Sequence, residues 1–82
     1  MIHIGFQNYV ARDKILAITR ADTSPLLRKK QNADDMGKLI DCTKGRMTRS
    51  LIHLEGNFMA TSAIEAPALI KRFKEGAVNE KV

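Results

Sequence analysis

The segment 45–49, Gly-Arg-Met-Thr-Arg, holds the residues whose types and spacing come closest to a chemical site. Arg46 and Arg49 stand three positions apart, Lys44 precedes them, and the apolar run 51–54 follows at once. A short basic loop that leads into a strand presents guanidinium groups to phosphate from a rigid base. Glycine adds a close approach of the backbone, and threonine adds a hydroxyl. The segment therefore predicts a site that holds an anion, and nucleic acid is the anion that we favour.

An exposed loop with lysine and arginine present for solubility is the alternative interpretation. We prefer the functional one because arginine stands on both sides of the loop. The segment is not a phosphate-binding P-loop, since the glycine spacing and the terminal Lys-Ser/Thr pair are absent.

The sequence does not suggest an enzyme, a metal site or a cofactor. No nucleophile and base accompany the basic loop. His3 and His53 lie in predicted strands with no cysteine or carboxylate at ligand spacing. Asp34, Asp35 and Asp41 lack a partner for acid–base work, and a helix surface or a turn explains them better.

Further basic residues extend the pattern. The chain carries 14 Lys and Arg against 9 Asp and Glu, a net charge of +5, which favours polyanions without requiring them. The excess is concentrated between Arg28 and Arg49, with seven basic residues against three acidic ones. Arg28 follows a predicted helix start, where free amides already favour anions, and Lys14 could extend a basic rim. Lys29 and Lys30 are better explained as a solvated helix face.

The elements that must position this loop follow from hydrophobic patterning. Apolar alternation and β-branched residues predict five strands, and N-cap and proline signals predict two short helices. Ser24 is the expected N-cap of the first helix, Pro25 its first residue, and Gly37 its stop. Asn57 with Gly56 predicts a hairpin turn, and Gln7-Asn8 another turn. The strands are expected at 2–4, 14–19, 38–42, 49–55 and 58–62, and the helices at 26–36 and 67–75.

The order β-β-α-β-β-β-α predicts an α+β fold with a mostly antiparallel sheet in one small domain, 1–82, whose tail 76–82 is frayed. The strand at 14–19 is apolar on both faces. Two short helices hardly cover both faces of a five-stranded sheet. We therefore expect either that the sheet curls on itself or that another copy covers it, and we predict a homo-oligomer larger than a dimer.

Cys42 is the single cysteine, so we interpret it as a packed, reduced thiol. No signal peptide and no apolar run long enough to span a membrane is evident. These features predict a cytoplasmic protein.

Several segments together resemble one known family. They are Ile-His-Ile-Gly-Phe-Gln-Asn-Tyr-Val at 2–10, Ile-Leu-Ala-Ile at 15–18, Ser-Pro-Leu-Leu-Arg at 24–28, Gly-Lys-Leu-Ile-Asp-Cys-Thr at 37–43 and Gly-Arg-Met-Thr-Arg at 45–49, with Pro67 opening the last helix. In this pattern the chain resembles the bacterial extracellular-matrix regulatory protein RemA family over residues 2–75.

The resemblance implies a DNA-binding transcriptional regulator that assembles into a ring, with a fold related to LytTR-type domains and DNA wrapped around the ring. Some members control biofilm-matrix genes. By this resemblance Arg46 and Arg49 become the foremost contacts to double-stranded DNA. Lys44, beside them in the loop, completes the basic site, with Lys14 and Arg28 as possible additions.

A second hypothesis is an oligomeric scaffold that binds an anionic small ligand, such as a nucleotide, at the same loop. Against it, the sequence shows no aromatic residue near the loop on which a base could stack, since Tyr9 and Phe58 are remote in sequence.

Overall fold

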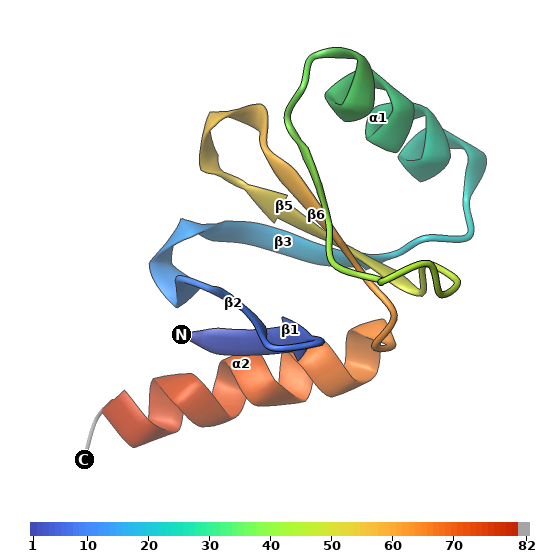
Figure 1. Ribbon diagram of the computed structural model, residues 1–82. Helices are drawn as coiled ribbons and strands as arrows, with labels where there is room; N and C mark the ends of the chain where they lie inside the picture. The colour runs from blue at the N-terminus through green and yellow to red at the C-terminus, as the bar shows by residue number, and fades with distance from the viewer. Residues whose placement is uncertain (81–82) are drawn as a thin grey trace.

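The computed structural model describes the backbone of residues 1–80 and the side chains of residues 1–75. Within that part of the chain, six strands and two α-helices alternate with short turns (Figure 1). Their order is β1 (Ile2–Gly5), β2 (Asn8–Val10), β3 (Ile15–Arg20), α1 (Ser24–Asp35), β4 (Leu39–Asp41), β5 (Ser50–Leu54), β6 (Met59–Ser62) and α2 (Ala66–Glu80). The predicted α+β class is confirmed.

The strands form two sheets, not one. Four of them make a sheet in the order β3-β5-β6-β4, while β1 and β2 make a separate antiparallel hairpin. In the larger sheet β5 is antiparallel to both β3 and β6, and β4 is parallel to β6. Strands β3, β6 and β4 therefore run in the same direction. Helix α1 connects β3 to β4, and a helix is the usual connection between two parallel strands of one sheet.

The hairpin corrects the prediction of five strands. A turn was expected at Gln7-Asn8, but Phe6 and Gln7 occupy it, with φ of 50° and 63°, and Asn8 opens β2. The side-chain amide of Asn8 donates to the Gly5 carbonyl at 2.9 Å and closes the turn. A strand of three residues carries too little alternation to be recognised by periodicity.

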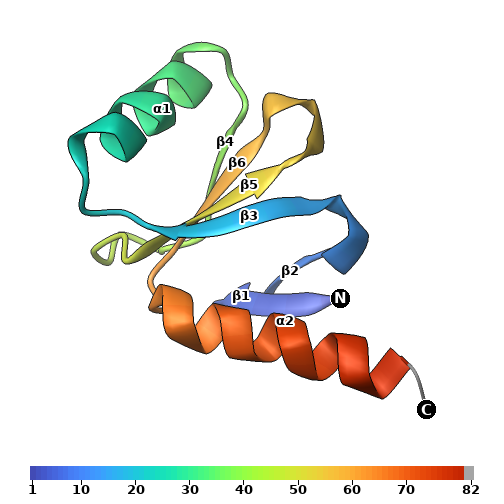
Figure 2. The ribbon, with the colours of Figure 1, turned by 180° about the vertical axis from the view of Figure 1, so that it is seen from behind.

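Each face of the larger sheet is covered by a different layer. Helix α1 lies over one face, and the hairpin with α2 lies over the other (Figure 2). On β5, Leu51 points to the α1 side and Ile52 to the opposite side, and both are fully buried. The chain thus covers most of both faces by itself, which the count of two helices did not anticipate.

The edges of the sheet remain apolar and exposed. Leu16 on edge strand β3 is 67% exposed, and Ile40 on edge strand β4 is 47% exposed. Unpaired edges of this kind favour pairing or packing with another chain.

The ends of α1 differ in detail from the predictions. The N-cap is Thr23, so Ser24 and Pro25 lie inside the first turn. Gly37 stops α1 as predicted, because its φ of 71° is one that glycine adopts without strain. Its amide donates to the Asp34 carbonyl at 3.0 Å, and the Lys38 amide donates to the Ala33 carbonyl at 2.8 Å. These two bonds satisfy carbonyls that the end of the helix would otherwise leave free.

Helix α2 begins at Ala66, one residue before Pro67, and continues to Glu80 instead of ending at Glu75. An interior glycine costs a helix only about 1 kcal/mol, so Gly76 does not end it. The final residues of the predicted frayed tail, 81–82, lie outside the described part of the chain. Among the helices that are described, none is long and apolar enough to cross a membrane.

Candidate nucleic-acid interface

The basic loop lies at one end of the larger sheet, where several chain segments meet (Figure 1). The pairing register aligns Arg20, the last residue of β3, with Ser50 and Ser62. Asp41, the last residue of β4, pairs with Thr61 on β6. The loop 42–49 joins β4 to β5 at this end, so both of its ends are fixed by the sheet.

The tip of the loop is a tight turn. The amide of Arg46 donates to the Thr43 carbonyl at 3.0 Å, and the two residues between them, Lys44 and Gly45, have φ of 53° and 79°. Two successive positive φ angles define a type I′ turn, for which glycine is well suited. A Cβ on Gly45 would meet no atom within 4 Å. The space beside the glycine is open, so a ligand can approach the backbone there.

Asp41 anchors the start of the loop. Its Oδ1 accepts hydrogen bonds from the Thr43 amide at 2.9 Å, the Thr43 hydroxyl at 2.7 Å and the Thr61 hydroxyl at 3.0 Å. The bonds from Thr43, followed by that from Thr61, lower the pKa of Asp41 because they favour its charged form. Sequence reasoning assigned Asp41 no role in the site, but the structure makes it the support of the loop.

Buried serines anchor the other end. The Arg49 amide donates to the Ser62 carbonyl at 2.8 Å. The Ser62 hydroxyl donates to the Ile4 carbonyl at 2.6 Å and accepts from the Ile64 amide at 3.0 Å. The Ser50 hydroxyl donates to the Ile64 carbonyl at 2.7 Å. Because buried polar groups are costly unless bonded, this network holds Arg49 at a defined place.

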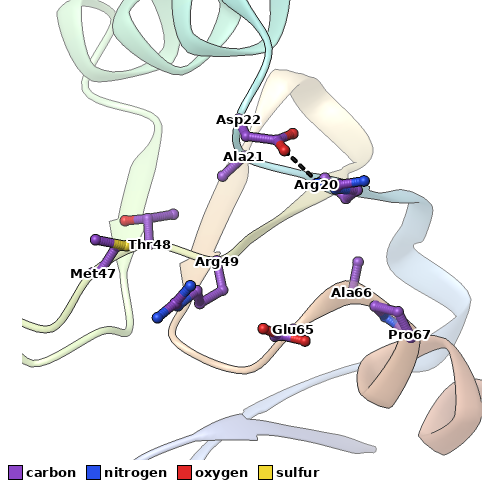
Figure 3. A pocket seen from close by; sticks show the side chains of 9 residues that line it. All are labelled: Arg20, Ala21, Asp22, Met47, Thr48, Arg49, Glu65, Ala66 and Pro67. Atoms are coloured by element: carbon purple, nitrogen blue, oxygen red, sulfur yellow. Dashed lines mark hydrogen bonds and ion pairs between the residues drawn. The ribbon is translucent and has the colours of Figure 1, made fainter.

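Arg49 borders a hollow of about 530 Å³ beside the loop (Figure 3). Arg20 is paired with Asp22 across the rim of this hollow. Among the described side chains, that of Arg49 makes no hydrogen bond or ion pair, although Glu65 lines the same hollow. The guanidinium is therefore available to an external anion. The walls come from the end of β3, the loop and the start of α2: Arg20, Ala21, Asp22, Met47, Thr48, Arg49, Glu65, Ala66 and Pro67.

Phe6 lies against the basic loop, which sequence reasoning missed. Its ring centroid is 5.8 Å from Nζ of Lys44 and 5.5 Å from Cζ of Arg46. The expectation that no aromatic residue stands near the loop is therefore wrong. No local spacing reveals this contact, because the β1–β2 hairpin and the loop are far apart in sequence and meet only in the tertiary structure.

The two remaining predicted contacts lie apart from the loop. Lys14 lies at the opposite end of β3, where its Nζ is 3.5 Å from Oε2 of Glu55. Arg28 is exposed in the second turn of α1, whose first turn lies at the same end of the sheet as the loop (Figures 1 and 2). The loop residues Lys44, Arg46 and Arg49 thus form one group, and Lys14 and Arg28 lie on other elements.

Cys42 is packed in the core and is not placed to act as a nucleophile. Cys42 is buried, and burial, followed by the charge of Asp41, raises its pKa, which makes it a poor nucleophile. In the described part of the chain, no group of three or more His, Cys, Asp or Glu residues could hold a metal ion. The arrangement is suited to binding phosphate groups through three exposed cations.

Comparisons with a family model and with individual proteins agree with each other. The family model described as "RemA-like: Extracellular matrix regulatory protein A-like" matches residues 1–73. A protein of Fervidobacterium nodosum is 42% identical over 95% of this chain and 84% of its own length. One of Thermotoga maritima is 47% identical over 92% of this chain and 82% of its own length. Both relatives carry the name "Putative regulatory protein".

Proposed function

The chain belongs to the RemA-like family, and from this premise we propose that it is a transcriptional regulator that binds duplex DNA as a ring-shaped homo-oligomer. The regulatory names of its relatives support the role. The relation to LytTR-type domains and the control of biofilm-matrix genes stay predictions that rest on the family resemblance.

The observation that carries the proposal is the basic loop on its fixed base. Lys44, Arg46 and Arg49 are exposed, and hydrogen bonds at both ends of the loop limit its movement. Cations in such a loop contact phosphate oxygens and release counterions from DNA. Because these contacts ignore base identity, sequence preference arises mainly from how easily a duplex bends.

The exposed edges of the sheet support self-association. Leu16 and Ile40 lie on opposite edge strands of one sheet, and a closed ring would cover both. A ring also repeats the basic loop around its circumference. Loops that are weak singly then act at high effective concentration on one duplex. Lys14 and Arg28 serve in this arrangement as secondary contacts along the path of the DNA.

The test is a gel-shift titration with a very short and a long duplex over a series of salt concentrations. The proposal expects the long duplex to bind more tightly, with affinity that falls steeply as salt rises. Equal affinity for both lengths excludes the multivalent mechanism, and absence of any shift at low salt excludes DNA binding itself.

A second candidate function is the binding of an anionic small ligand such as a nucleotide. The observation in its favour is Phe6, which offers an aromatic face next to Lys44 and Arg46, and the hollow beside Arg49 offers space. Calorimetry with nucleotides separates the two functions. Saturable nucleotide binding without any DNA shift favours this second candidate.

A further inference from the structure

The turn of the β1–β2 hairpin presents Phe6 to two cations of the basic loop. Nζ of Lys44 lies 5.8 Å and Cζ of Arg46 lies 5.5 Å from the ring centroid. At such distances an aromatic face attracts a positive charge. We propose that Phe6 is a positioning residue, which holds Lys44 and Arg46 in the orientation that phosphate binding requires. The proposal rests on the DNA-binding function above and adds a residue to its site.

The backbone at Phe6 is unfavourable for a bulky residue. Its φ of 50° is in the left-handed region, which few residues other than glycine adopt. That conformation is strained and persists only where neighbouring contacts enforce it. The enforcing bonds run from the Asn8 side chain to the Gly5 carbonyl at 2.9 Å, and from the Gln7 amide to Nε2 of His3 at 3.1 Å. These bonds hold the backbone of the turn that carries the Phe6 ring.

Core packing does not explain the ring. Phe6 is 39% exposed and belongs to neither hydrophobic cluster. Tyr9, on the same hairpin, provides the comparison: it is more exposed still, and its ring lies 5.1 Å from that of His3. A cation already held over a ring loses less side-chain freedom when it binds phosphate than a freely rotating one does. Phe6 can therefore strengthen DNA binding without touching DNA.

The experiment compares Phe6→Leu, Phe6→Tyr and Tyr9→Leu on a short duplex that engages few subunits. Leucine keeps an apolar side chain but has no aromatic face, whereas tyrosine keeps the face. We expect Phe6→Leu to bind about two- to fivefold more weakly, the usual worth of an exposed cation–π contact. Phe6→Tyr should retain the wild-type affinity for DNA, and so should Tyr9→Leu. Wild-type affinity in Phe6→Leu overturns the proposal.

A double-mutant cycle separates positioning from direct contact. In a background that carries Lys44→Ala and Arg46→Ala, Phe6→Leu should have no further effect, because no cation remains to be positioned. An unchanged loss in that background means that the ring touches DNA itself, which also overturns the proposal.

A measurement without DNA keeps this inference distinct from the proposed function. The ring should shift the NMR signals of the Arg46 and Lys44 side-chain methylenes upfield, and Phe6→Leu should abolish the shift. If the shift is present but the wild type binds no DNA, the proposed function fails, and with it the role of the contact. If the shift is absent while the wild type binds DNA, the positioning role alone fails.

Discussion

Asp41 accepts two hydrogen bonds from Thr43 through one carboxylate oxygen: from the amide at 2.9 Å and from the hydroxyl at 2.7 Å. The negative charge at the foot of a cationic loop thus has a structural task. Bonds of this type fix the chain direction at the start of a turn. The proposed DNA site therefore depends on an acidic residue, although its negative charge by itself would repel DNA.

The anchoring role of Asp41 predicts an effect on DNA affinity opposite to the one that net charge alone predicts. Asp41→Ala raises the net charge by one unit but releases the loop, so we expect weaker DNA binding. An ordered, solvent-screened bond to a charged group is worth about 1 kcal/mol, which corresponds to about a fivefold loss of affinity. Asp35→Ala is the matched control, because Asp35 lies at the end of α1 and bonds to the Gln31 side chain. Gel-shift titration of both variants decides the matter; stronger binding by Asp41→Ala would contradict the anchoring role.

Removal of an arginine from the loop should also weaken DNA binding, but through a lost phosphate contact and not through a loosened loop. Arg46→Ala or Arg49→Ala should weaken DNA binding and reduce the slope of log affinity against log salt by about 0.9 for each lost phosphate contact. Folding and assembly should be unchanged because both side chains are exposed. Lys71→Ala, on α2, is the control of equal charge change. Loss of the oligomer in light scattering would assign these arginines to a subunit interface instead.

Assembly should depend on the exposed edge of β3. Leu16 belongs to neither core cluster, so Leu16→Lys should leave the subunit folded while it opposes apolar contact between copies. We expect the wild type to sediment and scatter as an oligomer larger than a dimer at micromolar concentration, and the variant as a smaller species. A wild type that is monomeric under these conditions refutes both the ring and the multivalent mechanism.

The free energy of unfolding should fall in mild acid because of His53. Burial, followed by the charge of Lys29, lowers the pKa of His53, and its Nε2 lies 2.8 Å from the Thr19 hydroxyl. The folded state therefore takes up a proton less readily than the unfolded state. The contribution of His53 is fully present above its unfolded pKa, about 6.5, and is lost as pH falls from there through the folded value.

Urea unfolding at pH 8 and at pH 5.5 tests this, with His53→Gln as the comparison. The wild type should lose more stability between the two pH values than the variant, which has no titrating group at this position. An identical loss in both proteins would assign the pH dependence to other groups.

The sequence by itself determined the local features of this protein. Runs rich in Ile and Leu indicated β3, β4 and β5, and the turn signal at Gly56-Asn57 indicated that a further strand, β6, follows β5. Gly37 indicated the end of α1, because glycine readily adopts the positive φ of a helix end. All of these signals are properties of neighbouring residues. The cluster of Lys44, Arg46 and Arg49 was visible for the same reason, since a single loop contains all three. The cationic character of the site thus follows from composition and spacing alone.

Only the tertiary structure decided what lies beside that loop. Strand β1 was predicted at 2–4, but its partner β2 was missed because it has only three residues. The turn between them was placed one residue late, because neither Phe6 nor Gln7 is a residue type that favours positive φ. Phe6 approaches Arg46 although one lies in the β1–β2 turn and the other in the β4–β5 loop. The bond from Thr61 to Asp41 joins β6 to β4, and the bond from Ser62 to Ile4 joins β6 to β1. Such contacts depend on strand order and register. Both are set when the two faces of β5 pack against separate layers, and that packing involves residues from the whole chain.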